Sequence, residues 1–186
     1  REPSRASAAA RSCSRAQKAA LLSSLAYRPR LVILDEPFSG LDPLVRDDFI
    51  RGLLELTELE GWSVFVSSHD IAEVERLADR VAILNRGRLE LHEAAADLQA
   101  RFRAVEVVRN AEAALPLDLP PSWLNVEVAG RVVRFTESRY AADALTASIA
   151  ARFPDARQHE ARPMTLREIF VALARTYRLN GSSMGA

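Results

Sequence analysis

The sequence of 186 residues contains one cysteine and one lysine, and its first 39 residues contain no glycine. The single cysteine, Cys13, excludes a disulfide framework or a thiolate metal site within one chain. The single lysine is Lys18, and the first glycine is Gly40. A phosphate-binding loop of the form G-x-x-x-x-G-K-[ST] places glycines before a lysine, because backbone amides cradle the phosphates and the lysine meets their oxygens. The sequence therefore contains no such loop.

The charges and the apolar pattern exclude further classes. The 25 basic and 25 acidic residues cancel, so the net charge gives no argument for nucleic acid or an anionic membrane as a partner. No apolar run approaches the ~20 residues that span a bilayer, and the first residues lack the apolar core of a secretion signal. With 48% apolar residues, the composition predicts a soluble, cytosolic, globular chain with no nucleic-acid partner.

The most informative stretch is residues 31–43, which read LVILDEPFSGLDP. A short apolar run bounded by turn residues is typical of a buried parallel strand. Asp35 and Glu36 follow this run, at the end of the strand where open α/β sheets bind ligands. In phosphoryl transfer, one carboxylate can hold Mg²⁺ and another residue can orient the attacking water. The stretch therefore predicts half of a phosphate-handling site.

The periodicity along the chain predicts alternating helices and strands. Helices are expected at about 16–26, 43–60, 71–78, 93–102, 140–152 and 165–178, and strands at 31–36, 62–67, 81–84, 89–91, 105–108, 126–128 and 132–135. Asp42 and Pro43 are typical of a helix start, and the sequence Asn85-Arg-Gly-Arg of a hairpin turn. The order strand, helix, strand, helix, strand before residue 85 predicts a mostly parallel sheet with right-handed crossovers.

Four regions are expected from these patterns. Residues 1–13, rich in Arg, Ser and Ala, are interpreted as a disordered or non-native leader. Residues 14–103 form a partial α/β domain, and residues 104–178 a small α+β companion domain. Residues 179–186 are expected to be a frayed tail.

Three short motifs follow one another along residues 31–70. Taken singly, Asp35-Glu36 fits a solvated strand end, Ser39–Asp42 a helix start, and His69 a satisfied polar residue. Together, in this order and spacing, they resemble the ATP-binding cassette (ABC) ATPase family. Residues 31–36 are similar to its Walker B strand, Ser39–Asp42 to its D-loop, and residues 67–70 to its switch-histidine loop.

The resemblance covers residues 16–95 and implies the fold class and the roles of five residues. The fold would be α/β, the C-terminal part of a P-loop NTPase domain of ABC type. Asp35 would hold Mg²⁺, Glu36 would polarise the attacking water as a general base, and His69 would contact the γ-phosphate. Ser39 and Asp42 would lie on the loop that helps to complete the nucleotide site across a head-to-tail dimer.

The same resemblance implies a function and partners. The chain would be an ATP-binding and ATP-hydrolysing subunit that energises an ABC transporter, with ATP and Mg²⁺ as cofactors in the complete protein. Its partners would be a multi-spanning permease and a second ATP-binding subunit, which would place it in the cytoplasm, on the inner face of the cell membrane. Residues 104–178 resemble an extension of some bacterial ABC exporter ATPases, which predicts an exporter with a separate permease.

One departure from the family stands before the predicted helix at 16–26. Where the glycine-containing signature loop is expected, the sequence has Ser12–Arg15 or Ser14–Gln17, without glycine. We therefore expect a truncated or frameshifted product or a natural split protein, inactive alone. The alternatives are a non-catalytic remnant or regulatory ABC-like protein, and a soluble ABC ATPase that is not part of a transporter.

Overall fold

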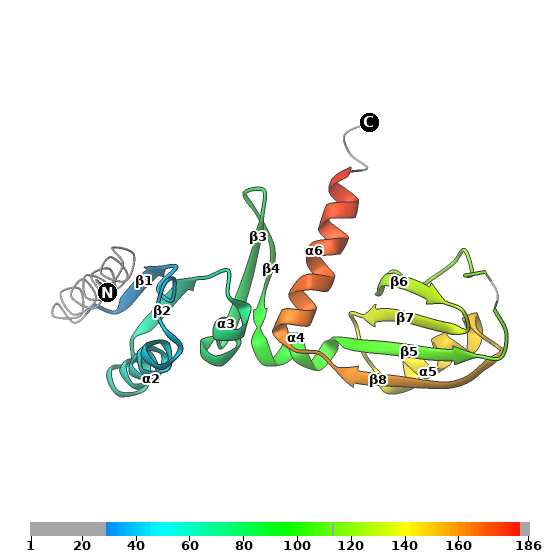
Figure 1. Cartoon of the computed structure of the whole chain (residues 1–186), viewed down its shortest axis with the longest axis horizontal. Helices are drawn as coiled ribbons and strands as arrows, with labels where there is room; N and C mark the ends of the chain where they lie inside the picture. The colour runs from blue at the N-terminus through cyan, green and yellow to red at the C-terminus, as the bar shows by residue number, and fades with distance from the viewer. Residues whose placement is uncertain (1–28, 113, 183–186) are drawn as a thin grey trace, which may run out of the picture. The chain divides into compact units, whose positions relative to one another are not determined.

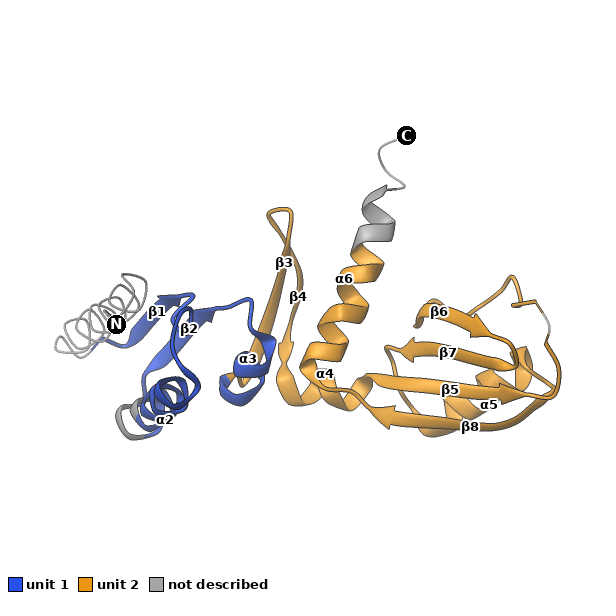
Figure 2. Ribbon diagram, viewed as in Figure 1, with its two compact units in different colours: residues 1–77 blue, residues 78–186 orange. Residues whose placement is uncertain are grey.

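The computed structural model describes residues 29–112 and 114–182 (Figure 1). The chain divides into two compact units, residues 1–77 and 78–186 (Figure 2), and each is described by itself. The leader expected at 1–13 and the helix expected at 16–26 lie outside the described residues. The expected domain boundary at 103/104 falls inside the second unit, and the predicted domain limits remain predictions.

The first unit contains two parallel strands, each followed by a helix. Its elements are β1 (Leu31–Asp35), α2 (Pro43–Glu60), β2 (Ser63–Ser67) and α3 (Ile71–Leu77). β1 and β2 are paired in parallel, from Leu31 opposite Ser63 to Asp35 opposite Ser67. This register brings the carboxyl ends of the two strands side by side (Figure 1).

Local sequence explains the limits of α2 and its packing. The Asp42 side chain caps its first turn with Pro43 as the first helical residue, and Gly61 ends it with a φ of 64°. Ile50 and Leu53 of α2 are buried with Phe38, and the partly buried Val64 packs against them. The predicted helix at 43–60 is confirmed.

The second unit begins with an antiparallel hairpin of β3 (Arg80–Asn85) and β4 (Arg88–Ala94). Its turn has positive φ at Arg86 (49°) and Gly87 (77°), as the favoured two-residue hairpin turns require. The predicted hairpin is confirmed. The mostly parallel sheet is not confirmed beyond β1 and β2, since the third predicted strand pairs in the described residues with β4 alone.

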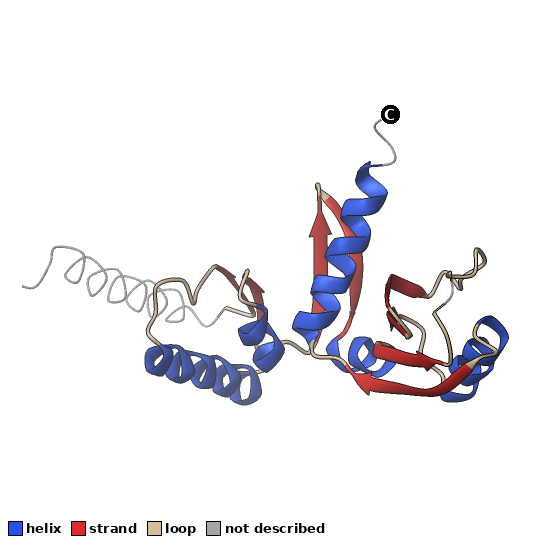
Figure 3. Cartoon of the chain, turned by 45° about the vertical axis from the view of Figure 1, so that its right-hand side comes forward, coloured by secondary structure: helices blue, strands red, loops and turns tan. Residues whose placement is uncertain are grey.

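The rest of the second unit is a four-stranded antiparallel sheet with three helices (Figure 3). The strands lie in the order β6-β7-β5-β8. The elements are α4 (Ala95–Arg101), β5 (Arg103–Arg109), β6 (Trp123–Ala129), β7 (Val132–Glu137), α5 (Ala142–Arg152), β8 (Ala156–Pro163) and α6 (Leu166–Ser182). None of the helices in the described ranges is long and apolar enough to cross a membrane.

The core of this sheet lies between its strands and α5. Val107 and Val133 are fully buried, in one cluster with Leu145 and Ile149 of α5. The Trp123 ring stacks on Phe135, with 4.0 Å between the ring centroids. Because alternate residues of a strand point to opposite faces, this face takes every second residue of β5 and β7.

The strand β8 was not predicted from the sequence. Its residues, ARQHEARP, are mostly polar and exposed, because it forms one edge of the sheet. Edge strands carry charged side chains and proline, which lowers the risk of pairing with other chains. The two predicted helices around it are confirmed, as α5 and α6. The described residues thus form a mixed α/β structure, consistent with part of a P-loop NTPase.

Candidate functional site

Polar side chains converge where β1 and β2 end. Asp35 and Ser67 are the last residues of the two strands and lie opposite each other. The Ser67 hydroxyl donates a hydrogen bond of 2.5 Å to Oδ1 of Asp35. The Glu36 amide donates to the Ser67 carbonyl at 3.0 Å, which extends the parallel ladder by one residue. Ser67 therefore fixes both carboxylate residues at the end of the sheet.

The backbone turns sharply directly after β1. Glu36 has a φ of 45°, in the left-handed region that residues other than glycine rarely adopt. The Glu36 carbonyl accepts from the Ser39 amide at 3.2 Å, and Gly40 continues the turn with a φ of 73°. Strained residues of this kind cluster at functional sites. Here the turn directs the Glu36 side chain toward the loop that follows β2.

Glu36 and His69 make the central contact of the site. Nδ1 of His69 lies 2.7 Å from Oε2 of Glu36, and since a carboxylate only accepts, the ring nitrogen donates. The His69 side chain is 79% exposed and that of Glu36 39%, so both remain accessible from solvent. The hydrogen bond to Glu36, and then the charge of that carboxylate, raise the pKa of His69 above its usual value of 6.5.

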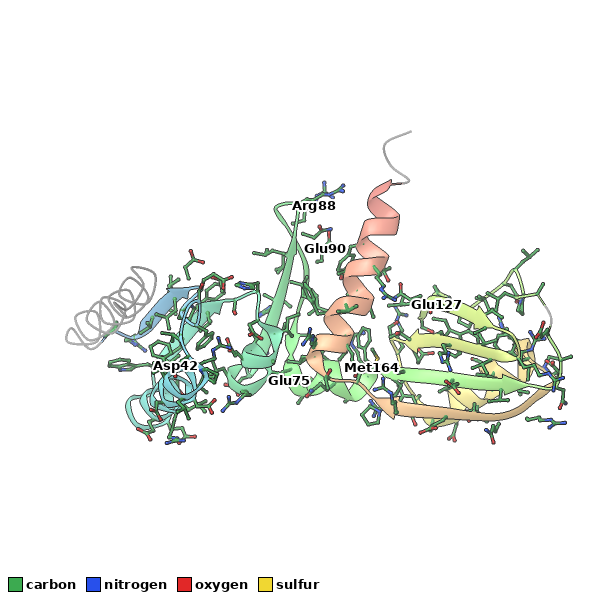
Figure 4. All side chains as sticks on the ribbon, viewed as in Figure 1. Asp42, Glu75, Arg88, Glu90, Glu127 and Met164 are labelled. Carbon is green, nitrogen blue, oxygen red and sulfur yellow. The ribbon has the colours of Figure 1, made fainter. Side chains whose placement is uncertain are left out.

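Ser39 and Asp42 lie on the turn before α2, where both are exposed. Oδ1 of Asp42 accepts from the amides of Leu44 and Val45, at 3.1 Å each, at the start of α2 (Figure 4). The local role of Asp42 in this chain is therefore that of a helix cap. The structure brings Asp35, Glu36 and His69 together and leaves Ser39 and Asp42 on the neighbouring turn.

The side chains of this site can bind Mg²⁺ only together with ligands from other molecules. Mg²⁺ is usually bound by one or two carboxylates together with water and substrate phosphates. Asp35 is exposed and offers one such carboxylate, already oriented by Ser67. In the described residues, no group of three or more His, Cys, Asp or Glu side chains could hold a metal by itself. Asp35 therefore fits the metal of a metal–nucleotide complex and not a site made by protein alone.

Sequence reasoning missed two residues that organise this site. Ser67 lies in the segment 67–70 that resembles the switch-histidine loop. A hydroxyl residue at the end of a strand is only a weak indication in the sequence of the hydrogen bond that Ser67 makes with Asp35. Arg46, one turn into α2, forms ion pairs with Asp70 and Glu73 of the segment that follows His69. Only the folded arrangement shows these contacts, since Arg46 and Asp70 are 24 residues apart.

Comparisons with known proteins find relatives of part of the chain. Residues 16–75 match the family described as AAA domain, putative AbiEii toxin, Type IV TA system. The chain is 53% identical over 74 residues to the sulfate/thiosulfate import ATP-binding protein of Xanthomonas campestris, which covers 40% of the chain and 22% of that protein. It is 40% identical over 100 residues to the energy-coupling factor transporter ATP-binding protein of Methanothermobacter thermautotrophicus, covering 54% of the chain and 31% of that protein.

A third relative is the aliphatic sulfonates import ATP-binding protein of Xanthomonas axonopodis, 39% identical over 75 residues, covering 40% of the chain and 26% of that protein. The matches to these three relatives thus span between 22% and 31% of their length. The predicted resemblance is confirmed: the chain matches part of the nucleotide-binding domain of ABC transporter ATP-binding subunits.

Proposed function

We propose that this chain contributes the acid and histidine half of an ATP-hydrolysing site in the ATP-binding subunit of an ABC transporter. The observation that carries the proposal is the contact of 2.7 Å between Glu36 and His69, next to Asp35 at the carboxyl ends of two parallel strands. Glu36 is the general base, His69 contacts the γ-phosphate, and Asp35 holds Mg²⁺. ATP bound with Mg²⁺ supplies the phosphoryl group and partial neutralisation of its charge.

The geometry supports separate roles for separate atoms. Oε2 of Glu36 accepts from His69, so Oε1 remains to accept a proton from the attacking water. His69 holds the Glu36 carboxylate in one orientation. Ser67 does the same for Asp35 from the other strand. Phosphoryl transfer needs such positioning and charge compensation more than covalent chemistry.

The remaining assignments extend this proposal to the whole assembly. Ser39 and Asp42 are exposed on the turn before α2, which suits contact with a second ATP-binding subunit in a head-to-tail dimer. The other partner is a multi-spanning permease, and the subunit lies in the cytoplasm on the inner face of the membrane. Of the three relatives described above, the sulfate/thiosulfate and sulfonate proteins are named as importers, so the predicted export direction has no support from them.

The wider fold is also part of the proposal. β1 and β2 are two strands of a mostly parallel sheet in a P-loop NTPase domain, and residues 104–178 form an α+β companion domain. The exposed face of β1 and β2 supports the first point. Leu31, Ile33 and Phe65 are 54%, 69% and 55% exposed there, whereas parallel sheets are normally covered on both faces.

Binding and hydrolysis of ATP test the proposal in two steps. Titration calorimetry of this chain with Mg²⁺ and ATP is expected to show no micromolar binding, because the sequence contains no G-x-x-x-x-G-K-[ST] loop. A chimaera that joins the N-terminal part of the Xanthomonas campestris relative, which is named as an ATP-binding protein, to residues 16–186 is expected to bind and hydrolyse ATP.

A double-mutant cycle in the chimaera then tests the carrying observation. Glu36→Gln and His69→Ala are each expected to lower kcat by roughly 10²-fold or more, and the double variant by little more than the worse single variant. Glu55→Gln, which changes an exposed carboxylate of α2, is the matched control and should leave kcat unchanged. Strictly multiplicative losses, or a single variant with the parental rate, would contradict the shared role of Glu36 and His69.

A further inference from the structure

Arg46 joins the two loops that flank the candidate site. It lies in the first turn of α2, and its amide donates to the Asp42 carbonyl at 3.0 Å. One end of its guanidinium, Nη2, donates to the carbonyl of Leu41 at 3.3 Å. Leu41 follows Ser39 and Gly40 in the turn after β1. Arg46 is therefore fixed to the turn that carries Ser39 and Asp42.

The other end of the same guanidinium reaches the loop after β2. Nη1 of Arg46 lies 3.4 Å from Oδ2 of Asp70, the residue next to His69, and forms an ion pair with Glu73. Oδ1 of Asp70 accepts from the Ala72 amide at 3.2 Å, so the two oxygens of Asp70 serve the start of α3 and Arg46 separately. The planar fork of an arginine suits such a bridge, whereas lysine offers a single point charge.

The ion pair between Arg46 and Glu73 is largely shielded from solvent. The Glu73 side chain is only 5% exposed, and that of Arg46 is 28% exposed. Burial, followed by the charge of Asp70, raises the pKa of Glu73, and the charge of Arg46 acts in the opposite direction. Without Arg46, the buried carboxylate would lose its cationic partner, which is strongly unfavourable. Glu73 therefore holds Arg46 in the position from which it reaches both loops.

We propose that Arg46 is a positioning residue that couples the Ser39–Asp42 turn to the His69 loop. A displacement of either loop would stretch the bonds to the other, so the two segments keep one common geometry around Glu36. This inference rests on the proposed function for its catalytic meaning, but the coupling itself is a property of the folded chain without nucleotide.

The test is amide hydrogen exchange of the full chain, measured by NMR in the absence of nucleotide. One reporter is the amide of Leu41, which donates to the Phe38 carbonyl in the turn before α2. The other is the amide of Val74 in α3, which donates to the carbonyl of Asp70, the last residue of the loop after β2. Arg46→Met keeps the length of the side chain and removes its donors. Exchange at both reporters is expected to rise by roughly tenfold, the loss typical of hydrogen bonds to a charged group, while amides of β1 and β2 keep their protection.

Two further variants separate coupling from general stabilisation. Arg76→Met removes the ion pair of 2.5 Å with Asp47, which also ties α3 to α2 but touches neither loop, and should leave both reporters unchanged. Arg46→Lys keeps the charge and should restore protection at one reporter at most. Unchanged exchange at both reporters in Arg46→Met, or a uniform rise that includes β1 and β2, would overturn the proposal.

If Arg46→Met fails to fold, the double variant Arg46→Met with Glu73→Leu removes the uncompensated charge as well. It is expected to keep the protection of β1 and β2 and to lose that of both loops; retained protection in the loops would refute the coupling. In the ATP-hydrolysing chimaera, Arg46→Met should lower kcat with little change in KM. A chimaera that hydrolyses no ATP would contradict the proposed function. The hydrogen-exchange result would still test the coupling by Arg46, because it is measured without nucleotide.

Discussion

Glu168 of α6 stabilises the second unit through two kinds of contact, and its charge can be removed without removing the helix cap. Its Oε1 lies 2.7 Å from Nη2 of Arg162, at the end of β8. Its Oε2 accepts from the Thr165 amide at 3.0 Å, while the Thr165 hydroxyl accepts from the Glu168 amide at 3.2 Å. This reciprocal pattern is a capping box. Glutamine can serve in the same box.

The structure gives the size of the ionic contribution. The hydrogen bond from Arg162, and then that from the Thr165 amide, lower the pKa of Glu168 from 4.5 to about 2. At about 1.4 kcal/mol per pKa unit, this difference corresponds to roughly 3.4 kcal/mol. The Glu168 side chain is 36% exposed, so solvent screens the pair. We expect Glu168→Gln to lower the free energy of unfolding by about 1–2 kcal/mol at neutral pH.

The effect has a defined pH dependence. Because the pKa of Glu168 is lower in the folded than in the unfolded state, the ionic stabilisation is fully present above the ordinary value of 4.5 and is lost as the pH falls through about 2. The difference in stability between the wild-type chain and Glu168→Gln should therefore shrink below pH 4.5 and vanish below about pH 2.

Urea unfolding followed by tryptophan fluorescence measures this difference. The chain has two tryptophans, and a Trp62→Phe background leaves Trp123, which is 5% exposed in the core of the second unit. Glu160→Gln is the control, since Glu160 acts on Arg162 through its charge alone. Equal stability of Glu168→Gln and the wild type at pH 7, or a difference that persists unchanged at about pH 2, would refute the reasoning.

Two further predictions concern single side chains. Asp42→Ala removes the acceptor for two amides at the start of α2 and should cost about 1 kcal/mol of stability in the first unit, measured by urea unfolding with circular dichroism; an unchanged midpoint would contradict the cap. Phe153→Ala empties a site 1% exposed beneath Trp123 and should cost roughly 3–5 kcal/mol, measured by Trp123 fluorescence; a loss under about 1 kcal/mol would contradict its place in the core.

Local signals in the sequence predicted the elements that local chemistry determines. Asp42 with Pro43 marked the start of α2, and the Asn85 to Arg88 turn marked a hairpin. In each case the deciding contacts lie within a few residues along the chain. The site residues Asp35 and Glu36 were found for the same reason, since they follow a short apolar run directly.

Features that depend on distant contacts could not be predicted in this way. The strand β8 is mostly polar and is ordered by pairing with β5, about 50 residues away, rather than by its own pattern. Likewise, Arg46 gives no signal in the sequence beyond a charged residue on a helix, because its partners Asp70 and Glu73 follow β2. The place of the third predicted strand in a parallel sheet was inferred from element order alone and stays a prediction, since among the described residues that strand pairs with β4.

The most direct test of the central claim is single-turnover cleavage of ATP by the chimaera carrying Glu36→Gln. If Glu36 takes the proton of the attacking water, the variant should bind Mg²⁺ and ATP as the parent does and cleave it roughly 10²–10⁴ times more slowly. Cleavage at the parental rate with parental binding would show that Glu36 is not the base, and the role assigned to its contact with His69 would fail with it.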